Sequence, residues 1–119
     1  MTSFKQKKGQ CAEFIAQRYL ESQGLQCVEK NYSCRSGEID LIMSDKETLV
    51  FIEVRSRQKA DYGSSIETVQ WNKQSRIIRS ALHYLQKKGL YDQIDCRFDV
   101  IGLDNLQKIV WIKDAFQVQ

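Results

Sequence analysis

Two β-rich runs in the middle of the chain constrain its fold most strongly. Residues 38–43 and 48–55 are together rich in Ile, Leu and Val, and only the polar segment 44–47 separates them. Runs of this composition and spacing are typical of paired antiparallel strands, because aliphatic and aromatic side chains suit a half-buried pleated surface. The sequence therefore predicts a central β-hairpin.

The remaining patterns surround this hairpin with two helices and three strands. Apolar residues recur every three or four positions over residues 10–23 and 66–88, and a glycine, Gly24 or Gly89, follows each segment as a helix cap. Further strands are expected over residues 25–34, 94–103 and 108–113. The resulting order αβββαββ predicts an α/β domain in which helices pack on a mixed β-sheet.

Composition excludes several classes of function. The chain has 119 residues, 42% of them hydrophobic, which fits a single domain over residues 1–119. Its one histidine excludes multi-histidine metal sites, and its four cysteines lack the two-residue spacing of a zinc ribbon. The glycines match neither a Walker loop nor a dinucleotide fingerprint. Chemistry therefore has to rest on carboxylates and basic groups.

Charge and hydropathy bound the partners of the protein. The formal net charge of +3 is too small to make the whole surface bind polyanions, so any basic surface is local. No apolar run approaches the ~18 residues of a membrane span, and the first residues lack the apolar core of a signal peptide. We therefore expect a cytoplasmic protein that does not bind membranes.

Strand periodicity assigns the residues of the hairpin to two faces. In the first strand, Asp40 and Ile42 fall on one face, whereas Ile39 and Leu41 fall on the other. One face of the second strand combines apolar and charged side chains, which in order are Leu49, Phe51, Glu53, Arg55 and Arg57. Carboxylates therefore interrupt faces that are otherwise apolar.

A turn at the centre of the polar segment, between residues 46 and 47, sets Asp40 directly across from Glu53. Two like charges at this separation destabilise a sheet unless a cation joins them. Mg²⁺ suits the arrangement because it takes oxygen ligands, including one or two carboxylates, and lowers the pKa of a bound water. The pair therefore predicts metal-dependent phosphodiester hydrolysis. The alternative is an ion pair of either acid with Arg55 or Arg57.

Two further side chains extend this candidate site. Glu13 falls at the edge of the apolar stripe of the first predicted helix, a position from which it reaches the sheet. The alternative is an ordinary acid on the helix surface. Arg55 shares the face of Glu53 and places a permanent positive charge against a phosphate, although an arginine cannot act as a base.

The second predicted helix carries a polar, mostly basic face, whose residues are Lys73, Arg76, Ser80, His83 and Lys87. We expect Lys73 and Arg76, together with Arg57, to bind a nucleic-acid backbone. The alternative is an ordinary solvated face. Trp71 and Trp111 are interpreted as core or rim residues, with stacking on bases as the alternative.

The motifs of these segments, taken together, resemble a known family. They are Gly37-Glu38-Ile39-Asp40-Leu41-Ile42 and Val50-Phe51-Ile52-Glu53-Val54-Arg55-Ser56-Arg57, preceded by Gly9-Gln10-Cys11-Ala12-Glu13 and followed by Arg97-Phe98-Asp99-Val100. Over nearly the whole chain they resemble the YraN family of bacterial proteins. That family is similar in turn to the PD-(D/E)xK nuclease superfamily, which includes archaeal Holliday junction resolvases and the fold of tRNA-splicing endonucleases.

The resemblance implies a restriction-endonuclease-like fold, with a tRNA-endonuclease-like αβββαβ core and a mixed β-sheet flanked by helices. It implies that Glu13, Asp40 and Glu53 occupy the acidic positions that bind Mg²⁺ or Mn²⁺. Arg55 then occupies the position usually held by a catalytic lysine, and Lys73 is an alternative source of that amine. The implied substrate is DNA or RNA, with DNA favoured over RNA and structured or branched DNA suggested by analogy with the resolvases, which commonly act as homodimers.

The arginine at position 55 leaves two other classes of function open. One is a module that binds nucleic acid or another partner, keeps the nuclease fold and cleaves weakly or not at all. The other is a scaffold that binds neither metal nor nucleic acid, because a fold does not carry an activity with it.

Overall fold

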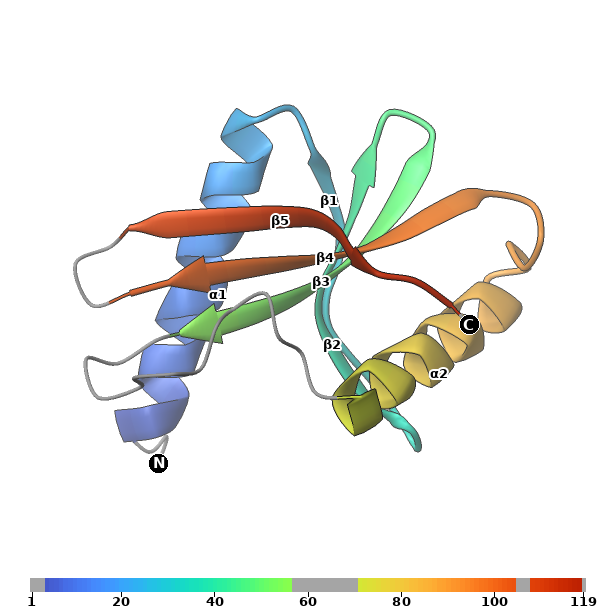
Figure 1. Ribbon diagram of the computed structural model, residues 1–119, viewed down its shortest axis with the longest axis horizontal. Helices are drawn as coiled ribbons and strands as arrows, with labels where there is room; N and C mark the ends of the chain where they lie inside the picture. Colours follow the sequence, from blue (N-terminus) through green and yellow to red (C-terminus); the bar gives the residue numbers. More distant parts are fainter. Residues whose placement is uncertain (1–3, 57–70, 105–107, 119) are drawn as a thin grey trace.

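The computed structural model describes residues 4–56, 71–104 and 108–118 (Figure 1). Its elements, in chain order, are α1 (Phe4–Ser22), β1 (Gln26–Cys34), β2 (Gly37–Asp45), β3 (Thr48–Ser56), α2 (Trp71–Lys87), β4 (Asp95–Leu103) and β5 (Ile109–Phe116). This is the predicted αβββαββ order. Neither helix is long and apolar enough to span a membrane, within the part of the chain that the structure describes.

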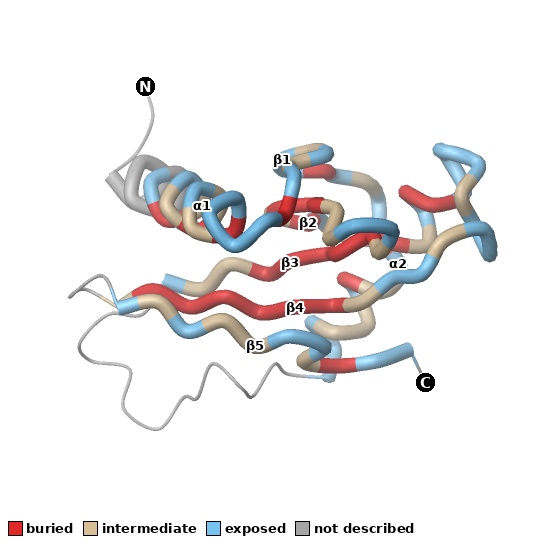
Figure 2. The backbone as a smooth tube through the Cα atoms, turned by 90° about the horizontal axis from the view of Figure 1, so that it is seen from above, coloured by how far each residue is buried: buried red, intermediate tan, exposed pale blue. Residues whose placement is uncertain are grey.

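The five strands form one mixed sheet in the order β1-β2-β3-β4-β5. Strands β3 and β4 are parallel, and every other neighbouring pair is antiparallel. Parallel neighbours need a long crossover, and here the crossover carries α2. The two helices lie on opposite sides of the sheet, as Figures 1 and 2 show. The predicted α/β class with helices on a mixed sheet is therefore confirmed.

Each helix covers its own hydrophobic core. The core under α1 contains Ala16 and Leu20 of the helix together with residues of β2, β3 and β4, and the core under α2 contains Ile77, Ala81, Tyr84 and Leu85. Strand β3 contributes to both cores, so its residues 49–53 are all buried. Figure 2 shows the same concentration of buried residues along β3 and β4. Because β3 is covered on both faces, its sequence is a nearly continuous apolar run.

The β2–β3 hairpin turns where the sequence predicts. Asp45 pairs with Thr48, so the loop consists of residues 46 and 47, and Lys46 adopts a left-handed conformation at φ 56°. The same register pairs Leu41 with Ile52. Extended by one residue on each strand, it sets Asp40 opposite Glu53.

Several predicted boundaries were wrong at the ends of elements. Helix α1 begins at Phe4 instead of residue 10. Lys and Gln in that first stretch favour a helix without giving it an apolar stripe, so periodicity could not detect it. Strand β5 continues to Phe116, three residues past the predicted end. The predicted first turn of the second helix, residues 66–70, lies outside the described residues.

The cap glycines are confirmed, and one predicted surface residue is not. Gly24 and Gly89 have φ angles of 102° and 69°, which favour glycine, and each follows the last turn of a helix. Ser80, expected on the polar face of α2, is fully buried. Its hydroxyl donates a hydrogen bond to the carbonyl of Arg76 at 2.8 Å, so its polar group is satisfied inside the helix. A small side chain there lets α2 approach Gly37 of β2 closely.

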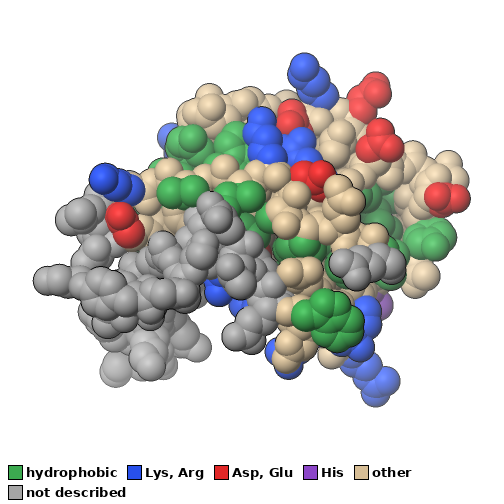
Figure 3. All heavy atoms as spheres, viewed as in Figure 1, with side chains coloured by type: hydrophobic (Ala, Val, Ile, Leu, Met, Phe, Trp, Pro, Cys, Tyr) green, Lys and Arg blue, Asp and Glu red, His purple; other side chains and the backbone are tan. Residues whose placement is uncertain are grey.

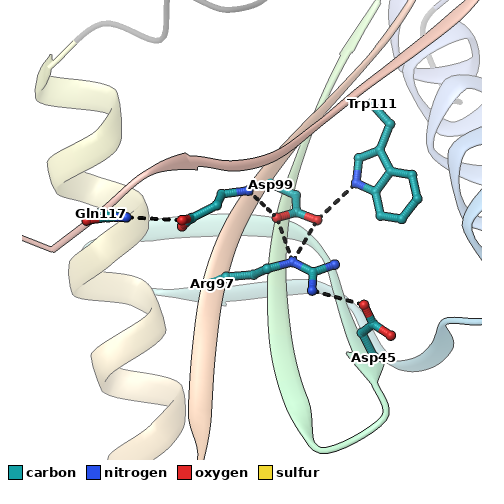
Figure 4. A network of polar contacts seen from close by, with 6 residues as sticks. Asp45, Arg97, Asp99, Trp111 and Gln117 are labelled. Carbon is teal, nitrogen blue, oxygen red and sulfur yellow. Dashed lines mark hydrogen bonds and ion pairs between the residues drawn. The ribbon is translucent and has the colours of Figure 1, made fainter.

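A buried carboxylate, Asp99, ties β4 to β5 (Figure 4). It accepts hydrogen bonds from the Trp111 indole and the Asp114 backbone amide, both at 2.9 Å, and from Arg97 Nε at 3.1 Å. Three residues of β5 lie opposite Asp99 alone between the pairs at Phe98 and Val100. The Asp99 side chain thus satisfies an amide that this bulge leaves outside the ladder.

Replacing Asp99 with Ala is expected to destabilise the protein by about 3–5 kcal/mol, because Arg97 then keeps a partly buried charge with one partner fewer. Urea denaturation followed by circular dichroism measures the change. Asp95→Asn, on the same strand but exposed, is the matched control and should alter stability by less than about 0.5 kcal/mol. Equal stabilities for the two variants would contradict the role given to Asp99.

Candidate functional site

The hairpin opens at the end opposite its turn. Pairing between β2 and β3 ends at Leu41 and Ile52, one step before Asp40 and Glu53. In place of a further ladder bond, the backbone amide of Val54 donates a hydrogen bond to Asp40 Oδ2 at 2.8 Å. Strand β3 meanwhile stays paired with β4 as far as its last residue. The two acids therefore lie where the strands separate.

The predicted faces of the first hairpin strand are wrong around Asp40. Ile39 belongs to the core under α2, whereas Leu41 belongs to the core under α1, although strict alternation would put both on one face. On β1, the residue between the partners of Ile39 and Leu41 is Asn31, which has a φ angle of 53°. Asn tolerates this left-handed conformation better than most residues. It bends the ribbon beside Asp40, which therefore lies at the boundary between the two cores.

Three carboxyl groups meet at this boundary. Glu13 of α1 faces Asp40 and Asn31, both of which lower its pKa, but burial and the charges of Glu38 and Glu53 raise that pKa overall. Burial and like charge both favour the protonated form of a carboxyl group. The first of the predicted alternatives for Glu13, a side chain that reaches the sheet, thus agrees with its position.

Asp40 carries the largest perturbation in the site. Its pKa is raised to about 8, first by burial and then by the negative charge of Glu53, with Glu13 adding to the repulsion. The Val54 amide and the Lys73 ammonium group oppose the rise without cancelling it. Such a shift marks carboxylates that are held together against their repulsion, an arrangement common at functional sites.

Lys73 supplies positive charge at the other side of the cluster. Its Nζ atom lies 2.7 Å from Glu53 Oε1, and the Glu53 side chain is only 7% exposed. A pocket of about 240 Å³ opens here, lined by Gly37, Glu38, Asp40, Glu53, Lys73, Arg76 and Ile77. The pocket thus combines acids of β2 and β3 with basic side chains of α2.

The donor set fits a hard divalent cation. Carboxylate oxygens are the ligands that Mg²⁺ and Mn²⁺ prefer, and Lys73 already places a cationic group against Glu53. Within the described ranges, no group of three or more acidic, histidine or cysteine side chains is already arranged to hold a metal ion. A metal ion here would therefore draw part of its coordination shell from the carboxylates and the rest from water or substrate, as Mg²⁺ usually does.

The structure distributes the other predicted site residues as follows. Arg76 lines the carboxylate pocket with Lys73. Arg55 is half-buried on β3, where it is paired with Gly102 of β4. Arg57 lies outside the described residues. Lys73, predicted either to bind a nucleic-acid backbone or to supply the catalytic amine, contacts Glu53.

Sequence reasoning missed Asn31 and misjudged Trp71. An asparagine inside a β-rich run was the available signal for a break in strand geometry, because Asn favours the left-handed region. Trp71, interpreted as a core or rim residue, is 72% exposed. For Trp111 that interpretation is confirmed, since its ring packs edge-on against Tyr19 and its indole donates to Asp99.

The fold and its carboxylate pocket define an α/β protein with a mixed five-stranded sheet, and sequence comparison places the chain in a family. The model of the Uncharacterised protein family UPF0102 matches residues 12–103, a span that contains Glu13, Asp40, Glu53 and Lys73. The chain belongs to this UPF0102 family, which is the YraN-like family indicated by its motifs.

Similar proteins carry the same family description along nearly their whole length. A UPF0102 protein of Coxiella burnetii (strain RSA 331 / Henzerling II) is 51% identical over 119 residues, which cover 100% of this chain and 99% of the relative. One from Nitrosococcus oceani is 48% identical over 115 residues, covering 94% and 93%. One from Legionella pneumophila (strain Corby) is 46% identical over 112 residues, covering 93% and 95%.

Replacing Asp40 with Asn is expected to stabilise the protein at neutral pH when divalent metal ions are removed with EDTA. The folded protein keeps a proton on Asp40 up to about pH 8, whereas an unperturbed Asp loses it near 3.8. Because the folded state binds more protons between these values, its stability falls as the pH rises through this window. Asn carries no charge and can still accept the Val54 hydrogen bond. At about pH 7.5 we expect Asp40→Asn to be about 1–3 kcal/mol more stable in urea denaturation.

The difference should shrink as the pH falls toward about 4, where the unfolded wild-type chain also becomes protonated at this position. Glu47→Gln, at the exposed hairpin turn, is the control for a simple loss of charge. Identical stability of Asp40→Asn and the wild type across this pH range would show that the carboxyl groups do not repel one another.

Proposed function

We propose that this protein is a metal-dependent phosphodiesterase that cleaves nucleic acid, with structured or branched DNA as its substrate. The observation that carries the proposal is the meeting of Glu13, Asp40 and Glu53 where β2 and β3 separate, with the pKa of Asp40 raised to about 8 and Lys73 held against Glu53. A protein that held these groups for stability alone would gain by replacing one of the acids. The presence of these charged groups in this chain is explained if the acids bind a metal ion and Lys73 binds a phosphate.

Each acid has a distinct part in this proposal. Asp40 and Glu53 hold Mg²⁺ or Mn²⁺ from adjacent strands, and Glu13 completes the site from α1, directly or through a water molecule. Such an ion lowers the pKa of a bound water and offsets the charge that grows on a phosphate during attack. The Val54 amide fixes the orientation of the Asp40 carboxylate through its 2.8 Å hydrogen bond.

The basic groups bind the substrate. Lys73 and Arg76 line the same pocket as Asp40 and Glu53, so a phosphate that enters it meets both charges. Arg55 stabilises negative charge in the transition state but cannot accept a proton. Lys73 supplies the amine that the nucleases of the resembled superfamily take from their catalytic lysine. Arg57, two residues beyond Arg55 in the sequence, extends the proposed backbone contacts.

The activity can be tested with labelled single-stranded, duplex, flap and four-way-junction DNA and structured RNA, each incubated with the protein and Mg²⁺ or Mn²⁺. We expect cleavage that requires the metal ion and falls by about 100-fold or more in Asp40→Asn and in Glu53→Gln. Glu47→Gln, outside the pocket, should cleave like the wild type. Cleavage that survives in both site variants would place the activity elsewhere or in a contaminant.

Metal binding can be tested separately by thermal unfolding. Mn²⁺ or Mg²⁺ at about one hundred times its dissociation constant should stabilise the wild type by about 2.7 kcal/mol. Glu53→Gln should lose most of this stabilisation. Lys73→Met should keep it, because the carboxylates remain and the competing ammonium group is gone. Equal stabilisation of the wild type and Glu53→Gln would mean that the ion binds outside the pocket.

A binding module without catalysis is the second candidate, and the arginine at position 55 favours it. Arg55 stands where the resembling nucleases commonly carry lysine, and it cannot supply the amine or act as a base. Nucleic-acid binding that weakens as salt rises, in the absence of cleavage of every substrate above, would select this function.

A further inference from the structure

A second pocket lies on the flank of α2 that faces the C-terminal segment. It has a volume of about 160 Å³ and is lined from α2 by Trp71, Ser75, Ile78 and Arg79 and from the C-terminal segment by Gln117 and Val118. We refer to it as the tryptophan groove. Its lining residues are separate from those of the carboxylate pocket.

The tryptophan groove exposes two large apolar side chains, those of Trp71 and Val118. Trp71 is 72% exposed and Val118 is 61% exposed. Exposed aromatic surface beside polar groups is typical of a binding site, whereas a structural tryptophan is usually well buried. Ser75 and Gln117 add polar groups at the edges of this surface. The groove therefore offers a flat aromatic face with hydrogen-bonding groups around it.

The charge around the groove selects an anionic occupant. No acidic residue occurs between Trp71 and Leu90 in the sequence. Arg79 lines the groove, and its Nε atom donates to the Ser75 carbonyl at 3.4 Å, which holds the guanidinium group along the helix. On the C-terminal side, the nearest acid in the described sequence is Asp114. It does not line the groove, and its carboxylate accepts a hydrogen bond from the Gln117 side chain at 3.0 Å. Figure 3 shows a hydrophobic side chain projecting beside Lys and Arg side chains in the region of α2.

Helix geometry relates the groove to the carboxylate pocket. Trp71, Ser75 and Ile78 are spaced four and three residues apart and share one flank of α2, whereas Lys73 and Arg76 project toward the carboxylate pocket on another. An α-helix with its side chains is only ~10–12 Å across. A nucleic-acid strand that leaves the carboxylate pocket and crosses α2 therefore reaches the groove within a few nucleotides.

We propose that Trp71 stacks on an unpaired base of the substrate, while Arg79 binds the adjoining phosphate. This inference rests on the proposed function and names its substrate class more closely: nucleic acid with a single-stranded segment a few nucleotides from the phosphate in the carboxylate pocket. A base inside a continuous duplex is stacked on its neighbours and cannot present its face to Trp71. Flaps, overhangs and open junction arms satisfy the requirement, and uninterrupted duplex does not.

The test compares the binding of a fluorescent single-stranded oligothymidylate with that of a blunt duplex, in EDTA, by anisotropy. Base–aromatic stacking predicts that Trp71→Ala weakens single-strand binding about 5- to 150-fold and leaves duplex binding within about twofold. Trp71→Phe, which keeps an aromatic face, should retain most of the single-strand affinity. Tyr91→Ala is the matched control, because Tyr91 is also an exposed aromatic residue, at 54%, but lies outside both pockets.

Intrinsic fluorescence supplies a second readout. Stacking should quench the emission of Trp71, and the quenching by oligothymidylate should disappear in Trp71→Phe, since Trp111 is held in the Asp99 network. Unchanged single-strand affinity in Trp71→Ala, or an equal loss for single strand and duplex, would overturn this inference while the proposed cleavage still stands. Failure of the wild type to bind or cleave any nucleic acid would instead overturn the proposed function and this inference with it.

Discussion

One hydrogen bond, from the Val54 amide to the Asp40 carboxylate, lies where a rung of the β2–β3 ladder would otherwise be. It lets the two strands separate at a point where both are still fixed by other neighbours, β2 by β1 and β3 by β4. A sheet of two strands could not sustain such an opening, because its only ladder would be lost. The opening ends the pairing between β2 and β3 just before Asp40 and Glu53, and the two side chains lie beside each other and beside Glu13 and Lys73. The candidate site therefore depends on a local interruption of the sheet that the rest of the sheet supports.

The same arrangement connects the site to both helices. Glu13 reaches Asp40 from α1, and Lys73 reaches Glu53 from α2. These contacts come from helices that cover two different cores, to both of which strands β2, β3 and β4 contribute. A change in the charge of the carboxyl cluster is therefore felt by elements on both sides of the sheet. Under the proposed function, this contact would couple substrate binding to the packing of α2, because a phosphate in the pocket would compete with Glu53 for the Lys73 ammonium group.

Much of the fold followed from local patterns, and the errors have identifiable physical causes. The turn between residues 46 and 47 and the placement of Asp40 across from Glu53 came from the period of a strand and a short polar segment, both of which are local. The faces around Asp40 could not be predicted the same way, because a left-handed Asn31 on the neighbouring strand alters them. Ser80 was misplaced because its hydroxyl is satisfied within its own helix, which removes the cost of burial. Asp99 gave no sign of its role, since Trp111 becomes its neighbour only through the pairing of β4 with β5, and Asp114 only through the β5 bulge.

The contact between Arg97 and Asp45 has a mechanical consequence for the hairpin. Arg97 Nη1 lies 2.9 Å from Asp45 Oδ2, and Asp45 is the last residue of β2 before the turn. Since Arg97 is also bonded to Asp99, the turn is fastened to β4, as Figure 4 shows. The hairpin is thus anchored at its closed end and unpaired at its open end. Asp40 lies five residues from this anchor along β2, so a rotation of β2 about the turn would move Asp40 farther than Asp45.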